Sequence, residues 1–184
     1  GVQAKGDFGR DGVYMPEYYY DKDNGRKVTK AGFVKDNRGL TYYLDEKGNK
    51  VLGLHEINGD LYYFRQGGAY KYTQLGDMWQ DSINYINGKI YYFGHDGKAI
   101  KNRFYQWGND WYYFYADGTA ATGAVQINGQ KLYFDKNHGR QVKGAFAPDG
   151  HYYDENSGEL VTNQTRTING VTYHFDENGN ATKV

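Results

Sequence analysis

A β-hairpin unit that recurs about every 20 residues constrains the fold of this chain more than any other feature of its sequence. Asn-Gly between alternating residues predicts a tight hairpin turn, because both central positions of a type I′ turn need positive φ. The tripeptides that carry the turn, Ile-Asn-Gly or Trp-Gly-Asn, begin at Ile57, Ile86, Trp107, Ile127 and Ile168. An aromatic residue stands seven positions after each of them, at Phe64, Phe93, Phe114, Phe134 and Phe175.

Looser copies of the unit end at Tyr20, Leu44 and Tyr153, and the steps along the whole series are 24, 20, 29, 21, 20, 19 and 22 residues. A period of this length is typical of a solenoid, because one unit is too small to bury its own apolar face and stacks on its neighbours. No apolar run has helical spacing, and aromatic residues make up 18% of the chain. We therefore expect an all-β fold, a β-solenoid of stacked β-hairpin repeats of about 20 residues with a largely aromatic core.

Both ends of the chain fall inside a repeat. Residues 5–8 match residues 143–146, and residues 179–183 match residues 139–143. We therefore expect residues 1–184 to be a single repeat array, cut from a longer array in a larger multidomain protein.

The longest step in the series, between Phe64 and Phe93, indicates an insertion over residues 67–82. We expect it to form an added strand pair or a loop packed over the solenoid. Trp79 is interpreted as a plug that fixes the insertion to the core, with a ligand platform as the alternative. The insertion also contains Tyr70, Tyr72 and Met78.

The composition argues against several classes of partner. Acidic and basic residues balance at 22 each, so no charge excess attracts nucleic acid or an anionic membrane surface. No apolar run is long enough to span a bilayer, and the chain has no cysteine for a disulfide or a thiolate metal site. We expect no nucleic-acid or membrane partner and no cofactor.

Nothing in the sequence predicts catalysis or a metal site. Acidic residues are numerous in the predicted return loops, but no pair stands across a pocket as the acid and base of a glycosidase would. Residues 21–25 resemble the start of a calcium loop, but its later oxygen ligands are missing, and Asp, Asn and Gly are ordinary turn residues. We predict a binding module and not an enzyme.

The hairpin around Asn128-Gly129 shows which side chains face a ligand. Side chains alternate between two faces along a strand, and a two-residue turn fixes the pairs across the hairpin. The predicted pairs are Gln126 with Lys131, Val125 with Leu132, and Ala124 with Tyr133. We expect the core face to consist of Val125, Leu132 and Phe134. The opposite face then carries Ala124, Gln126, Lys131 and Tyr133.

Tyr133 is the main candidate for a stacking platform, because the small Ala124 opposite it leaves room above the ring and Lys143 borders that room. The C–H face of a sugar stacks on an aromatic ring, and Gln offers its hydroxyls both donors and acceptors, whereas Lys only donates. One ring contact is worth about 0.5–1.5 kcal/mol, so a single site binds on the order of millimolar, while several sites on one polymer raise avidity by roughly 10²–10⁴. The repeats therefore favour a polymeric carbohydrate. The alternative is that such tyrosines only pack against the next repeat.

Other hairpins carry this pattern less completely. A second and more crowded candidate site consists of Phe104 opposite Tyr113 and Gln106 opposite Trp111, with Thr122 in the place of Lys143. We interpret the outward face of the hairpin around Asn87-Gly88 as packing, because it lacks a polar partner; it carries Ile83, Tyr85, Ile90 and Tyr92. In the last hairpin a histidine replaces the ring, which predicts a weakened site at His174.

These motifs resemble a known family. INGxxYYF, DxxG and [Val/Ala]-[Lys/Thr]-Gly-x-[Phe/Val] at this spacing are similar to the cell-wall-binding and glucan-binding repeats of Gram-positive bacteria, above all the glucan-binding domain (domain V) of glucansucrases from lactic acid bacteria and oral streptococci. The resemblance implies a domain of a secreted enzyme at the Gram-positive cell surface, whose pockets bind α-glucan such as dextran through a stacking Tyr with Gln and Lys or Thr. Carried over residue by residue, the pattern falls on Gln126, Tyr133 and Lys143 and, less fully, on Gln106, Tyr113 and Thr122.

Three other readings remain open at this point. Choline-binding modules have similar hairpins and hold a quaternary ammonium in a cage of aromatics, but the chain has only 3 Trp, and only Trp111 occupies the matching hairpin position. The sugar-binding repeats of clostridial toxins have a similar spacing. A spacer or self-association module would use its tyrosines for stacking alone.

Overall fold

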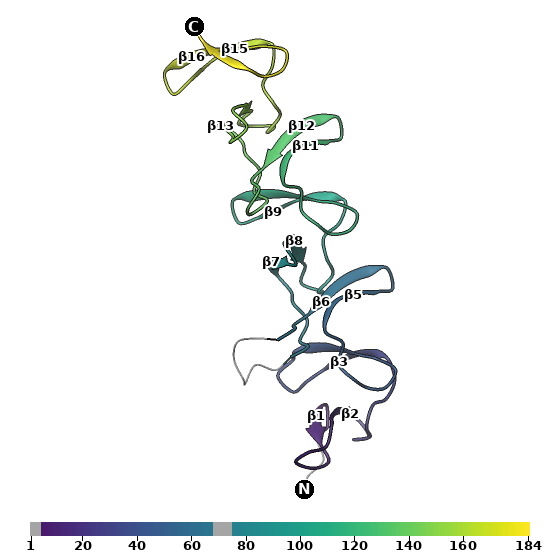
Figure 1. Ribbon diagram of the computed structural model, residues 1–184. Helices are drawn as coiled ribbons and strands as arrows, with labels where there is room; N and C mark the ends of the chain where they lie inside the picture. The colour runs from purple at the N-terminus through teal and green to yellow at the C-terminus, as the bar shows by residue number, and fades with distance from the viewer. Residues whose placement is uncertain (1–4, 68–74) are drawn as a thin grey trace. The chain divides into compact units, whose positions relative to one another are not determined.

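The computed structural model describes residues 5–67 and 75–184, and every regular element within these ranges is a β-strand (Figure 1). Consecutive strands pair into hairpins, and the last strand joins the final hairpin as a third member. This architecture confirms the predicted all-β fold of stacked hairpin repeats. Within the described residues there is no helix of the length and apolarity that a membrane span needs. The strands are β1 (Asp7–Arg10), β2 (Glu17–Tyr20), β3 (Gly32–Lys35), β4 (Thr41–Leu44), β5 (Gly53–Ile57), β6 (Asp60–Phe64), β7 (Ser82–Ile86), β8 (Lys89–Phe93), β9 (Arg103–Trp107), β10 (Asp110–Phe114), β11 (Gly123–Ile127), β12 (Gln130–Phe134), β13 (Ala145–Phe146), β14 (Tyr152–Tyr153), β15 (Gln164–Ile168), β16 (Val171–Phe175) and β17 (Ala181–Lys183).

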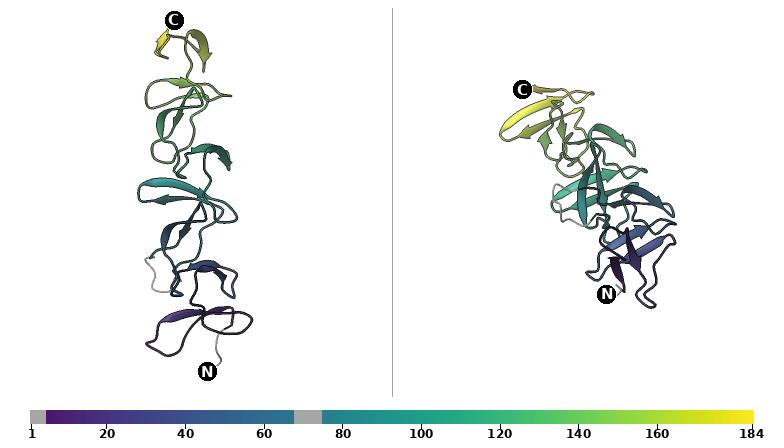
Figure 2. Two further views of the ribbon diagram at one scale, coloured as in Figure 1. Left: turned by 90° about the vertical axis from the view of Figure 1, so that its right-hand side faces the viewer. Right: turned by 60° about the horizontal axis from the view of Figure 1, so that its bottom comes forward.

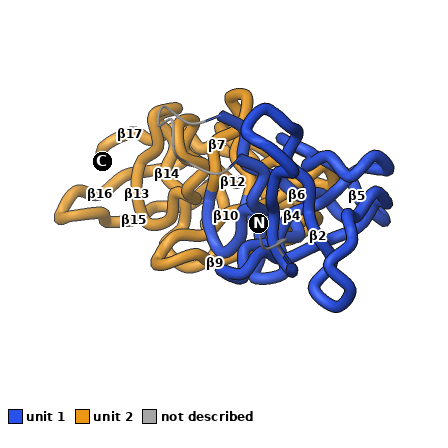
Figure 3. The backbone as a smooth tube through the Cα atoms, turned by 90° about the horizontal axis from the view of Figure 1, so that it is seen from below, with its two compact units in different colours: residues 1–83, 92–99 blue, residues 84–91, 100–184 orange. Residues whose placement is uncertain are grey.

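The chain divides into two compact units, which Figure 3 shows in different colours. The first unit comprises residues 1–83 and 92–99, and the second comprises residues 84–91 and 100–184. Within each unit, consecutive hairpins lie beside one another (Figure 2). The single array over residues 1–184 stays a prediction.

In the hairpin of β11 and β12, the first strand is half exposed and the end of the second strand is buried on both of its faces. In β12, the last three residues, Leu132, Tyr133 and Phe134, are all buried, whereas Ala124 and Gln126 of β11 are exposed. The turns have the predicted geometry, since Asn128 has a φ of 53° and is followed by a glycine with a φ of 79°. The paired residues of β11 and β12 are also those predicted.

The linker, which is the segment that follows the return turn after a second strand, joins its repeat to the one before it. Gln141 pairs with Phe134 of its own repeat, and its N–H donates to the carbonyl of Trp111 in the preceding hairpin at 2.9 Å. In the same way Ala120 donates to Ile90 at 2.8 Å, and Met78 donates to Thr41 at 2.7 Å. Linker side chains therefore reach the preceding hairpin.

The predicted insertion is described only in part, because residues 68–74, including Tyr70 and Tyr72, lie outside the described residues. Arg65 and Asp77 close its base, where the guanidinium donates to both carboxylate oxygens and the Arg65 N–H donates to the Asp77 carbonyl at 3.0 Å. The ring of Trp79 packs against Tyr63, with 4.3 Å between ring centroids. Trp79 thus acts as the plug, and residues 78 and 79 occupy the place of an ordinary linker.

The return turns are held by an aspartate that accepts backbone N–H groups. Asp154 accepts hydrogen bonds from the N–H groups of Asn156 and Ser157, both at 2.8 Å, and from Nη1 of Arg166 at 2.8 Å. These bonds, first the one from Ser157 and then the one from Arg166, lower the pKa of the Asp154 carboxyl far below its usual range. The ionised aspartate therefore stabilises this turn and ties it to β15.

We expect Asp154→Asn to lower the free energy of unfolding by about 1–3 kcal/mol at pH 7. The pKa of this carboxyl is lowered in the folded state, so its stabilising effect is present above the unfolded value of about 3.9 and is lost as the pH falls through the folded value. The difference from wild type, measured by urea unfolding, should shrink between about pH 4 and pH 2. Glu155→Gln on the same turn is the exposed control, and a pH-independent loss for Asp154→Asn would contradict this account.

Candidate functional site

Tyr133 is buried, and the prediction that it offers an open ring is wrong. Only 2% of its surface is exposed, and it forms a core cluster with Ala147 and Tyr153, whose ring centroid lies 5.7 Å away. Ala124 does stand opposite Tyr133, as predicted. The ring is covered by Val142 from the linker of its own repeat and by Ala147 and Leu160 from the next repeat, which all pack in the same cluster.

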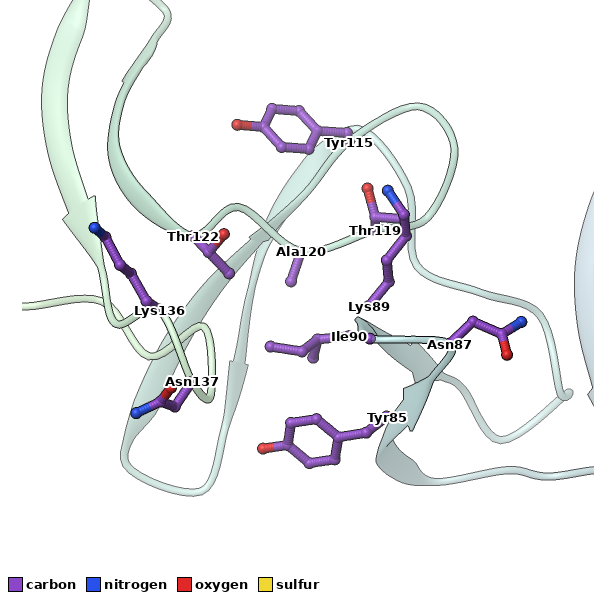
Figure 4. A pocket seen from close by; sticks show the side chains of 11 residues that line it. Tyr85, Asn87, Lys89, Ile90, Tyr115, Thr119, Ala120, Thr122, Lys136 and Asn137 are labelled. Carbon is purple, nitrogen blue, oxygen red and sulfur yellow. The ribbon is translucent and has the colours of Figure 1, made fainter.

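The second unit contains a groove of about 610 Å³ that we call the Tyr85–Tyr115 groove. The two tyrosine rings lie at opposite ends of it, with Ile90 and Ala120 between them (Figure 4). Lys89 lies on one side and Lys136 on the other. The full lining is Tyr85, Asn87, Gly88, Lys89, Ile90, Tyr115, Thr119, Ala120, Thr122, Lys136 and Asn137.

Both rings are supported from one side and open on another. Tyr85 is 54% exposed and meets the ring of His138 edge-on, with 6.0 Å between centroids. Tyr115 is 38% exposed and meets Tyr113 edge-on at 5.6 Å. Ile90, by contrast, is buried and forms the floor. The groove therefore presents two fixed aromatic surfaces to solvent above an apolar floor.

The charged residues that line this groove are both lysines. The carboxyl group of Asp117 accepts hydrogen bonds from the hydroxyl and the amide of the lining residue Thr119, at 2.6 and 2.9 Å. Thr119 lowers the pKa of Asp117 most, and Lys89 lowers it further. Burial, followed by the neighbouring Tyr113 and Asp117, raises the pKa of Tyr115, so its hydroxyl stays protonated at neutral pH and both donates and accepts hydrogen bonds.

A second groove in the same unit, the Trp111–Lys143 groove, has a volume of about 310 Å³. Trp111 is 37% exposed, and Nζ of Lys143 lies 5.4 Å from its ring centroid, within cation–π distance. The groove is lined by Phe104, Trp111, Gln130, Gln141, Lys143 and Ser157.

A third groove, of about 530 Å³, lies wholly in the first unit and is called the Phe33 groove. Its exposed ring is Phe33, whose centroid lies 5.2 Å from that of the buried Tyr62. The lining is Phe33, Lys35, Gly39, Thr41, Tyr62, Met78, Gln80, His95 and Asp96. The walls of all three grooves come from equivalent parts of three consecutive repeats. The first repeat contributes its hairpin, the second contributes its linker, and the third contributes its return turn or linker.

Lys143 and Thr122 lie beside different rings from those predicted. Lys143 lines the groove of Trp111 and not a space above Tyr133, and Thr122 lines the Tyr85–Tyr115 groove and not a site at Tyr113. The reason is the linker, which crosses to the preceding hairpin before it presents these side chains. The predicted set of Gln126, Tyr133 and Lys143 is therefore not gathered in one groove.

The remaining predicted residues keep their predicted pairs. Gln106 lies opposite Trp111, and Tyr113 lies opposite Phe104, with 4.8 Å between their ring centroids. Gln126, Lys131 and Ala124 are exposed on the next hairpin. The sugar-binding roles of these side chains stay predictions.

Two groove residues were missed or misread from the sequence. The sequence pattern predicts packing for Tyr85, yet Tyr85 is more than half exposed, while Ile90 and Tyr92 of the same predicted face are buried. The sequence does contain a signal for this exposure: Tyr85 directly precedes the turn tripeptide of its hairpin, as Gln106 and Gln126 do in theirs. Tyr115 lies outside the predicted sites, and the signal for it is that it stands where most repeats have the turn aspartate.

Comparisons with known proteins agree with this architecture. One family model, described as a choline-binding repeat, matches residues 121–164, and another, described as a putative cell wall binding repeat, matches residues 31–50, 102–120 and 166–181. Over 98% of its length the chain is 38% identical to Glucosyltransferase-I of Streptococcus downei, and over 97% it is 40% identical to Glucosyltransferase-I of Streptococcus mutans. It spans only 14% and 13% of those two proteins.

Among solved structures, the chain is similar to choline binding protein F from Streptococcus pneumoniae. The TM-score is 0.72 at 27% sequence identity, and the similarity covers 95% of this chain and 57% of the other.

We expect Tyr133→Ala to lower the free energy of unfolding by about 3–5 kcal/mol, because it empties a closed core cluster. Tyr85→Ala removes the same side chain from an exposed position and should cost less than about 1 kcal/mol. Urea unfolding followed by circular dichroism compares the two variants in the same unit. Equal losses would contradict the burial assigned to Tyr133.

Proposed function

The chain belongs to the family of cell-wall-binding repeats and is a glucan-binding domain of the kind found in glucansucrases, and from this premise we propose its function. On this proposal it is a non-catalytic carbohydrate-binding module. Its ligand is an α-glucan, a dextran-like polysaccharide or an oligosaccharide of the same linkage.

The observation that carries this proposal is the Tyr85–Tyr115 groove. A pyranose ring has apolar C–H faces and a rim of hydroxyls, so it needs an aromatic surface with hydrogen-bonding groups around it. The groove offers the two rings and Ile90 as the apolar surface, and Lys89 and Lys136 as donors at the rim. Thr, Asn and Tyr oxygens of the same lining supply acceptors.

The grooves of the second unit favour a neutral sugar over choline, the alternative suggested by the family models. A quaternary ammonium needs aromatic faces free of competing cations. Lys89 and Lys136 add like charge beside the two tyrosines, and Nζ of Lys143 already stands over Trp111 at 5.4 Å. A sugar hydroxyl, in contrast, accepts a hydrogen bond from each of these ammonium groups.

The wider setting follows from the relatives and is part of the same proposal. The chain spans less than a fifth of the glucosyltransferases that it matches, so the module would serve a larger secreted protein at the Gram-positive cell surface. There it would hold the polymer near a glucan-synthesising enzyme. The balanced charge of the chain agrees with a neutral polysaccharide and not with nucleic acid or membrane.

Affinity electrophoresis with dextran in the gel tests the proposal. Wild type should be retarded, and Tyr85→Ala and Trp111→Ala should each weaken the interaction roughly 2- to 10-fold, as expected for the loss of one ring contact. The double variant should be weaker than either single variant, because each removes one groove from a multivalent interaction.

Tyr14→Ala is the matched control, because Tyr14 is almost fully exposed and lines none of the three grooves. Wild type that migrates as it does without dextran would favour the spacer alternative. Protection against thermal unfolding by choline and not by dextran would favour the choline-binding alternative.

A further inference from the structure

Tyr115 departs from a regularity of the repeat. The residue that follows the last position of the second strand is aspartate in five repeats, at Asp21, Asp45, Asp135, Asp154 and Asp176. Such an aspartate holds the return turn: Oδ1 of Asp135 accepts the N–H groups of Asn137 and His138 at 2.8 and 2.7 Å. In the repeat of β9 and β10 a tyrosine stands in its place.

The return turn after β10 does not depend on the Tyr115 side chain. The Tyr115 N–H donates to the Thr119 carbonyl at 2.9 Å, as the Asp135 N–H donates to Arg140 at 2.8 Å. The side-chain role passes to Asp117, which accepts the N–H of Thr119 at 2.9 Å. The ring of Tyr115 is therefore available to the groove.

The other grooves show what Tyr115 adds. In the Trp111–Lys143 groove the corresponding residue is Asp135, and in the Phe33 groove it is Arg65; neither lines its groove. The Tyr85–Tyr115 groove has about twice the volume of the Trp111–Lys143 groove, 610 against 310 Å³. It also has two exposed rings at opposite ends of one floor (Figure 4).

We propose that the Tyr85–Tyr115 groove binds two consecutive sugar units, one on Tyr85 and the next on Tyr115, and that Tyr115 is the specificity-determining residue that selects an oligosaccharide over a monosaccharide. The inference rests on the proposed function and refines it. Ile90 and Ala120 form the apolar floor between the two rings, so a linked pair of pyranoses follows one continuous surface. With an aspartate at position 115 the groove would retain one stacking surface and bind one unit.

The test is an NMR titration of the whole chain with glucose, isomaltose and isomaltotriose, read at the backbone amides of Thr122 and Asn137. These two residues line this groove and neither of the others, so the readout is specific to it. In wild type, isomaltose should bind roughly 2- to 10-fold more tightly than glucose. Tyr115→Asp should bind glucose as wild type does and lose that preference, whereas Tyr85→Ala should weaken both ligands.

Two further variants guard against a change of fold. Tyr115→Phe keeps the ring and should keep the preference for isomaltose, while Tyr115→Leu keeps apolar bulk without a ring and should lose it. Tyr14→Asp is the charge-matched control and should behave as wild type. If Tyr115→Asp and Tyr115→Leu still bind isomaltose more tightly than glucose by the wild-type factor, this inference alone is overturned. If wild type responds to none of the three sugars, the proposed function is overturned with it.

Discussion

The backbone hydrogen bond from each linker to the preceding hairpin is the interaction on which the grooves depend. A two-stranded hairpin leaves carbonyl groups along its outer edge that need a partner. The N–H of Ala120 satisfies the carbonyl of Ile90, and the N–H of Gln141 satisfies that of Trp111. The bond involves no side chain, so the side chains beside it vary from repeat to repeat without loss of the scaffold.

That freedom explains why grooves at the same place in the repeat differ in chemistry. One has two tyrosines with lysines on either side, and the next has a tryptophan with Lys143 over its ring. The buried residues show less variety, since the last position of the second strand is a Phe, Tyr or Leu in every repeat. Stability therefore rests on the second strands, and binding chemistry rests on residues around them.

The hairpins could be predicted from the sequence because their determinants are local. An Asn-Gly turn fixes its own geometry and with it the pairs across β11 and β12, which the structure confirms. The exposure of a given ring is decided by residues in later repeats. Ala147 and Leu160 close the space above Tyr133, and a linker from another repeat brings Lys143 to Trp111. Strand alternation within one hairpin carries no information about either event.

Because each of the three grooves described above draws on three consecutive repeats, the repeat is a unit of folding but not a unit of recognition. Unequal recombination that inserts, deletes or exchanges one repeat would recombine the walls of up to three grooves at once, while the linker bonds preserve the scaffold. Such arrays can therefore change their repertoire of binding surfaces in single genetic steps, faster than by substitution of one side chain at a time.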